Sequence, residues 1–248
     1  MIPKVIHYCW FGRNPLPPLA LKCIESWKKF FPDYEIKEWN EDNFDINIIP
    51  YTKEAYEAKK YAFVSDYARF WILYQYGGVY FDTDVEVIKD MRPLVVCGNF
   101  MGKEIGALMK TKNGNEVACV NPGLGLASSK GNIFLKDALN EYLSRHFFMP
   151  NGDLNTKTIV TTTTEMLVER GYKSMCGIEK LNDWTIYPEE YFCPKNYYTG
   201  ELNITEQSYS IHHYDASWKS KKDKTKKKII RFLGNRLTNF IVKIKHLL

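Results

Sequence analysis

The sequence has no uninterrupted stretch of about 18 uncharged apolar residues, so it is not expected to contain a conventional transmembrane helix. Its first residues, MIPKVIHYCWFG, lack the basic segment, the apolar segment and the small-residue cleavage site of a signal peptide. The 6 cysteines include no C-x-x-C pair and no zinc-finger spacing. Scattered cysteines of this kind are typical of reduced thiols in a cytosolic protein, and they argue against an extracellular one.

Length and composition indicate a folded chain with two parts of opposite charge. The 248 residues, 45% of them apolar, are enough to bury a core and exclude wholesale disorder. The net charge is +5, but residues 219–248 carry eleven lysines and arginines against the single Asp223, so residues 1–218 carry a net charge of −5. We therefore predict a body at 1–218, a lysine-rich linker at 219–228 and a basic amphipathic helix at 229–248.

The hydrophobic pattern of the body predicts one α/β domain without internal repeats. KVIHYCW and YEIKEW are typical of strands, and LALKCIESWKKFF between them has helical spacing. A strand, a helix and a second strand within about 40 residues predict a βαβ unit and therefore parallel pairing. The remaining elements are expected as helices at 51–76, 133–142 and 158–170, a turn at 92–94, and strands at 79–81, 85–88, 100–108, 122–127, 184–187 and 209–213.

The motif Asp82-Thr83-Asp84 follows the short apolar strand VYF. Residues i and i+2 of a strand point the same way, so the two carboxylates converge where the strand end bends. Two carboxylates with open positions beside them suit Mg²⁺ or Mn²⁺ shared with phosphate oxygens. An isolated D-x-D is more often a solvated turn, so the interpretation depends on the neighbouring sequence.

A charged pair precedes this motif on a helix that we expect to be mostly buried. Asp66 and Arg69 lie on one helical face at i, i+3, among large apolar residues. A surface ion pair would contribute little, whereas a pair on a buried helix is better explained by a polar ligand. Gly77-Gly78 would then turn the chain so that the helix end and the D-x-D strand face one cleft.

Four segments in fixed order, IPKVIHYCWFG, SWKKFFPDYEIKEWNE, YAFVSDYARFWILYQYGGVYFDTDVEV and IHHYDASW, resemble the family-32 glycosyltransferases. These include bacterial capsule and lipopolysaccharide enzymes and yeast initiating mannosyltransferases. The sequence is also similar to the catalytic domain of the large clostridial glucosylating toxins. The resemblance implies a GT-A fold, a nucleotide-binding α/β architecture with a mixed, mostly parallel sheet flanked by helices. It also implies a divalent cation and a nucleotide-sugar donor, with retention of anomeric configuration.

The resemblance also implies roles for individual residues. Trp10 matches the aromatic residue that stacks on the nucleobase, and Ser65 a position near the base or ribose. Asp66 and Arg69 match the pair that holds donor sugar hydroxyls and the leaving phosphate. The other implied donor-site residues, which contact ribose, sugar or diphosphate, are Tyr80, Asp82, Asn121, Ser217 and Trp218. Asp66, Arg69, Asp82, Asp84 and Trp218 are the expected catalytic group.

The cluster His212-His213-Tyr214-Asp215 is expected to complete the cation site together with Asp82 and Asp84. In related folds a residue of this strand is a metal ligand, and a neutral imidazole suits Mn²⁺. Adjacent strand residues face opposite ways, so only one histidine reaches the cation. We favour His213, with His212 as the alternative if the strand register differs.

We therefore expect a retaining glycosyltransferase that moves a sugar from a UDP- or GDP-sugar to a glycan or glycolipid acceptor of a capsule, lipopolysaccharide or exopolysaccharide. The alternatives are a glucosylating effector that acts on protein and an inactive nucleotide-sugar-binding module. Residues 226–248 are expected to bind an anionic membrane surface, which would place the enzyme in the cytoplasm on the inner face of the membrane. Docking of this helix on the body is the alternative. Nucleic-acid binding is disfavoured because the body is acidic.

Overall fold

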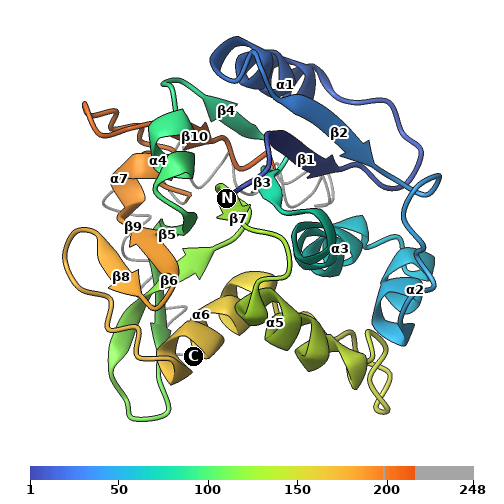
Figure 1. Ribbon diagram of the computed structural model, residues 1–248. Coiled ribbons are helices and arrows are strands. Elements are labelled where there is room, and N and C mark those ends of the chain that lie inside the picture. The colour runs from blue at the N-terminus through green and yellow to red at the C-terminus, as the bar shows by residue number, and fades with distance from the viewer. Residues whose placement is uncertain (198, 216–248) are drawn as a thin grey trace.

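A computed structural model of the chain describes residues 1–197 and 199–215 (Figure 1). The predicted linker and amphipathic helix at 219–248, with Ser217 and Trp218, lie outside the described residues. The helices are α1 Pro18–Phe30, α2 Pro50–Glu57, α3 Tyr61–Tyr76, α4 Arg92–Val96, α5 Ile133–Leu143, α6 Ile159–Glu169 and α7 Glu189–Phe192. The strands are β1 Val5–Cys9, β2 Glu35–Trp39, β3 Gly78–Tyr80, β4 Val85–Val87, β5 Asn99–Lys110, β6 Glu116–Asn121, β7 Leu126–Ser128, β8 Glu179–Leu181, β9 Trp184–Tyr187 and β10 Ser210–His212.

One large mixed sheet organises the body, in the order β2-β1-β3-β7-β5-β9-β8 with β6 paired to β5. The pairs β1–β2, β1–β3 and β5–β9 are parallel, and the other pairs of this sheet are antiparallel. The parallel β1–β2 pair joined through α1 confirms the predicted βαβ unit. A separate antiparallel pair, β4 with β10, brings the end of the described chain back beside residues 85–87.

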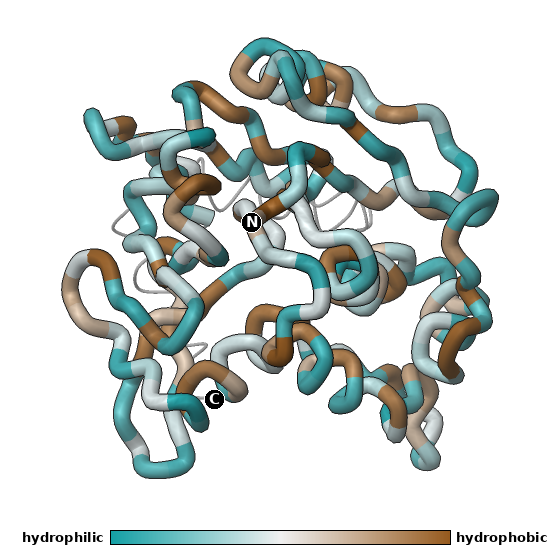
Figure 2. The backbone as a smooth tube through the Cα atoms, viewed as in Figure 1, coloured by the Kyte–Doolittle hydropathy of each residue, from teal (hydrophilic) through white to brown (hydrophobic). Residues whose placement is uncertain are grey.

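Two apolar clusters cover the opposite faces of the sheet. One contains the buried sides of α2, α3, α5 and α6, and the other contains those of α1 and α7 with β4. Strand alternation divides β1 between them, because Ile6 and Tyr8 join the second cluster while Cys9 joins the first. Apolar and polar segments alternate along α5 (Figure 2), as expected for a helix that buries one face. Figure 1 shows α1 and α3 on opposite sides of β1.

Three sequence predictions were wrong in detail. The helix expected at 51–76 is divided into α2 and α3, because Lys59 adopts a positive φ of 56° between them. The strand expected at 122–127 starts only at Leu126, because the Asn121 side chain accepts a hydrogen bond from the Gly123 N–H and forms a turn. The turn expected at 92–94 is the short helix α4.

Candidate active site

The D-x-D motif lies between two short strands at the centre of the fold. β3 ends at Tyr80, and the backbone N–H of Asp82 donates to the carbonyl of Gly123 at 3.1 Å. The N–H of Val85 then donates to the Asp82 carbonyl at 3.0 Å, so the motif forms a tight turn. The chain therefore bends at the strand end, as the sequence predicted, and both carboxylates face one pocket.

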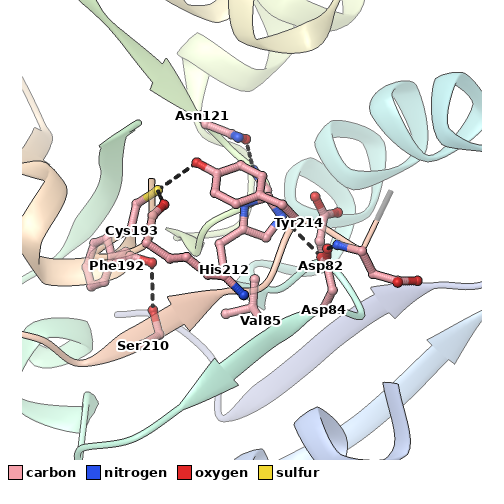
Figure 3. Close-up of polar contacts among 12 residues, drawn as sticks. Asp82, Asp84, Val85, Asn121, Phe192, Cys193, Ser210, His212 and Tyr214 are labelled. Atoms are coloured by element: carbon pink, nitrogen blue, oxygen red, sulfur yellow. Dashed lines mark hydrogen bonds and ion pairs between the residues drawn. The ribbon is translucent and has the colours of Figure 1, made fainter. Parts of the chain in front are cut away.

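His212, rather than His213, lies beside these carboxylates (Figure 3). Its Nε2 atom is 3.1 Å from the Asp84 carboxylate, and ligand atoms of Asp82, Asp84 and His212 all lie within 4.8 Å of one another. His213 instead contacts Glu86, with 2.8 Å between Nε2 and the carboxylate. Of the two histidines, the structure thus places the alternative, His212, and not the favoured His213, beside the aspartates.

The register of β10 against β4 puts His213 on the face of Glu86, whereas the bend of the D-x-D turn brings the Asp84 side chain to His212. His212 pairs with Val85, so their side chains lie on the same face, while His213 shares a face with Glu86. Asp84 precedes the first residue of β4 and turns towards His212. The backbone N–H of Asp215 also donates to the Asp84 carboxylate at 2.8 Å, which fixes the end of β10 against the motif.

The donor set of this cluster fits a divalent cation. Burial alone would raise the pKa of Asp84, but the His212 imidazole and the Asp215 N–H hold it at about 2, so the carboxylate is ionised. His212 is also buried, and its Nδ1 atom has no hydrogen-bond partner among the described residues. Two carboxylates and an imidazole are ligands that Mn²⁺ accepts, and Mg²⁺ prefers the oxygens.

A buried arginine joins α3 to the D-x-D turn. Arg69 is 4% exposed, and its Nη2 atom lies 3.0 Å from Asp66 and 3.2 Å from Asp82. Burial raises the pKa of Asp66 to about 6 although the guanidinium opposes this. The Asp66 carboxylate also accepts from the backbone N–H of Ile159, at the start of α6. The pair is therefore not a surface ion pair, and it connects three elements around the pocket.

The remaining predicted residues border the same pocket, whose volume is about 730 Å³. The Tyr80 hydroxyl donates to Asp82 at 3.2 Å, and the Trp10 indole N–H donates to the carbonyl of Asn14 at 2.6 Å. Trp10 is partly exposed just beyond the end of β1. The predicted site residues that the structure brings together here are Trp10, Ser65, Asp66, Arg69, Tyr80, Asp82, Asp84 and Asn121.

Glu104 and Tyr214 are among the residues of the pocket wall to which the sequence analysis gave no individual role. Tyr214 is buried, adopts a positive φ of 56°, and places its ring 4.2 Å from that of His212. Its hydroxyl lies 2.9 Å from the sulfur of Cys193 (Figure 3). Tyr214 is adjacent to the histidine pair and could have been suspected for that reason. Nothing in the local sequence singles out Glu104.

Residues 17–104 match the family described as the glycosyltransferase sugar-binding region containing the DXD motif. Inositol phosphoceramide mannosyltransferase 3 of Schizosaccharomyces pombe is 33% identical over 98 residues, which are 38% of this chain and 27% of that protein. The chain thus spans about a quarter of the length of that relative. An uncharacterized glycosyltransferase of Acanthamoeba polyphaga mimivirus is 27% identical over 227 residues, 88% of this chain and 84% of that protein.

A solved structure shares the fold across nearly the whole chain. It is a glycosyltransferase involved in the glycosylation of the major capsid of PBCV-1, with a TM-score of 0.50 at 10% identity. The alignment covers 93% of this chain and all of that one. At this identity the likeness establishes the architecture, which confirms the predicted GT-A-type fold.

Proposed function

We propose that the chain transfers a sugar from a nucleotide-sugar donor to a glycan acceptor, and the match of residues 17–104 to the glycosyltransferase sugar-binding region with the DXD motif supports this. The observation that carries this proposal is the convergence of Asp82, Asp84 and His212 within one pocket. Arg69 and Trp10 border the same pocket. A cation site beside an aromatic ring and a buried guanidinium suits a nucleoside diphosphate joined to a sugar.

In the proposed complex, the residues of the pocket orient the donor along its length. Trp10 stacks on the base, and Tyr80 and Ser65 lie near the ribose. Asp82, Asp84 and His212 would hold Mn²⁺ or Mg²⁺, and a bound cation supplies positive charge for the leaving diphosphate. Arg69 offers a planar fork of N–H donors to sugar or phosphate oxygens. Ser217 and Trp218, outside the described residues, are proposed as further donors to the diphosphate.

We propose that attack takes place on the face of the sugar that the diphosphate leaves, so that configuration is retained. Asp66 is the buried carboxylate nearest to Arg69, and it is already bonded to that guanidinium and to the N–H of Ile159. A carboxylate fixed in this way positions Arg69 and is a poor nucleophile. The departing phosphate is then the base that receives the acceptor proton.

The test is release of free nucleotide from a panel of UDP- and GDP-sugars with Mn²⁺ or Mg²⁺. We expect Asp84→Asn to reduce release by at least about 100-fold, because it removes a charged ligand from the cation site. The matched control is Asp153→Asn, which changes an exposed aspartate in a loop. Mn²⁺ affinity, measured by titration calorimetry, should fall in Asp84→Asn alone. Equal affinity and turnover in both variants would contradict the proposed cation site.

We propose that the acceptor is a lipid-linked glycan of a capsule, lipopolysaccharide or exopolysaccharide, and that residues 226–248 bind an anionic membrane surface. Of the helices that the structure describes, none combines the length and apolar character needed to cross a bilayer. The support for surface binding is the sequence itself, in which basic and apolar residues alternate at helical spacing after the lysine-rich segment. The proposed location is therefore the cytoplasmic face of the cell membrane.

Vesicle co-sedimentation tests the membrane proposal. The intact chain should sediment with vesicles that contain anionic lipid, and a chain without residues 221–248 should not. High salt should weaken binding without abolishing it, because screening reduces the charge contribution but not the burial of apolar side chains. An intact chain that stays in the supernatant at low salt would show that this segment serves another purpose.

A further inference from the structure

Glu104 lies at a break in the pairing of β5 with β6 and borders the same pocket as the aspartates. Between the paired positions Lys103–Val120 and Leu108–Ala118, four residues of β5 face a single residue of β6. Gly106, with a φ of 71°, allows the bulge. Bulges redirect side chains and are common beside active sites. Here the bulge brings Glu104 to the pocket wall.

Lys103, the neighbour of Glu104, does not neutralise this carboxylate. Its side chain is 3% exposed, and its Nζ atom donates to the carbonyl of Met175 at 2.6 Å and to that of Gly177 at 3.4 Å. Successive strand residues point to opposite sides, so the ammonium faces the 175–177 loop while Glu104 faces the pocket. The Glu104 carboxylate in the pocket wall is therefore not neutralised by the adjacent Lys103 ammonium, which binds the 175–177 loop.

Two neutral donors hold this carboxylate in place. The Asn121 side-chain amide donates to Oε2 of Glu104 at 3.2 Å, and the Tyr214 hydroxyl forms a hydrogen bond with the same side chain. A tyrosine hydroxyl carries its proton at neutral pH and can therefore donate to a carboxylate. An ionised carboxylate has about four acceptor positions, so the two donors leave capacity for a ligand.

The sheet order places Glu104 beyond the D-x-D turn as seen from Trp10. Trp10 follows β1, the aspartates follow β3, and Glu104 lies on β5, with β7 between β3 and β5. At about 4.8 Å per strand, β5 lies roughly 14 Å from β1. This step rests on the proposed function: with the base at Trp10 and the diphosphate at the aspartates, the sugar lies next along the sheet, beside Glu104.

We propose that Glu104, positioned by Asn121 and Tyr214, binds a hydroxyl group of a sugar in the reacting complex. Hydroxyl groups are donors, and their bonds to an ionised carboxylate are about twice as strong as neutral ones. The hydroxyl can belong to the donor sugar or to the acceptor saccharide, which share this chemistry. Glu104 makes no covalent bond in this role.

The test compares Glu104→Gln with the control Glu116→Gln, which changes an exposed residue at the other end of the β5–β6 pair. Glutamine has the same side-chain length and a carbonyl that can accept from Asn121, so the structure of the pocket wall should be unchanged. Three quantities are measured with Mn²⁺ present: affinity for the free nucleoside diphosphate, kcat/KM for donor hydrolysis in water, and kcat/KM for transfer to methyl hexosides.

We expect nucleoside diphosphate affinity to remain unchanged in Glu104→Gln. If the hydroxyl is on the donor sugar, kcat/KM for hydrolysis falls about 10- to 100-fold. If it is on the acceptor, hydrolysis persists and transfer to the hexosides falls by a similar factor. Either result supports the inference. Unchanged hydrolysis and transfer overturn it, as does a parallel loss of nucleoside diphosphate affinity, which would show a distorted cation site.

Failure of the proposed function gives a different result. A native chain that releases no nucleotide from any donor would overturn both the transfer activity and the role of Glu104. Full activity of the native chain together with full activity of Glu104→Gln overturns only the sugar-binding role. The Glu116→Gln control should match the native chain in every measurement.

Discussion

The buried His7 should make the stability of this protein depend on pH. It is 1% exposed, lies on β1, and its side chain reaches Gly77 just after the end of α3. The Trp39 indole N–H, which can only donate, points at Nδ1 at 3.1 Å, so Nδ1 must be the unprotonated nitrogen. Nε2 then carries the proton and donates to the Gly77 carbonyl at 2.9 Å. A second proton would have to sit on Nδ1, where it would oppose the Trp39 indole N–H, so the folded state favours the neutral imidazole.

The magnitude follows from the shift in pKa. Burial lowers the pKa of His7 from 6.5 to about 4, and the nearby Lys37 adds to this effect. Between about pH 6.5 and pH 4 the unfolded state binds more protons than the folded state, so the free energy of unfolding falls as the pH falls. A difference of 2.5 pKa units corresponds to about 3 kcal/mol, of which about 2 kcal/mol is lost between pH 7 and pH 5. This is a large part of an ordinary stability of about 5–15 kcal/mol.

Urea unfolding at pH 7 and pH 5 provides the assay, with His7→Gln as the variant that cannot titrate in this range. The variant should be less stable at pH 7, but its stability should depend less on pH than that of the native chain, by about 2 kcal/mol between the two pH values. The matched control is Asn113→Gln, which changes an exposed residue in the turn between β5 and β6, and this variant should follow the native chain. Equal pH dependence in His7→Gln and the native chain would refute the assignment of a buried, neutral His7.

Two substitutions test the geometry around the D-x-D turn. In Gly123→Ala the new Cβ would overlap the Asp82 carboxylate and lie 3.0 Å from Nη1 of Arg69, so nucleotide release should fall at least about tenfold; full activity would show that this turn can move freely. Arg69→Lys keeps the positive charge but cannot bridge Asp66 and Asp82 as the guanidinium does, so kcat should fall at least about tenfold while the circular dichroism spectrum is retained. Normal turnover in Arg69→Lys would show that charge alone suffices.

The predictable parts of this molecule depend on local sequence. Alternation and helical spacing predicted the β1–α1–β2 unit, and the D-x-D pair was located by its short apolar strand. The register of β10 against β4 could not be predicted, because it is set by pairing between segments more than 100 residues apart. The sequence favoured His213, whereas the structure places His212 beside the aspartates, because the chain bends at Asp84 just before β4 begins. Glu104 was missed because a bulge, rather than a pattern, brings it to the pocket.

The pairing of β4 with β10 has a consequence for synthesis of the chain. The contact between Asp84 and Asp215 joins residues 131 positions apart, and His212 is on the later strand. At about 5–20 residues per second, a ribosome needs roughly 7–26 s to extend the chain from the first to the second. During that interval the aspartates have no imidazole beside them. A nascent chain therefore assembles the cluster of Asp82, Asp84 and His212 only after nearly all of the body has emerged, and a product cut short before β10 would carry the D-x-D motif without the imidazole.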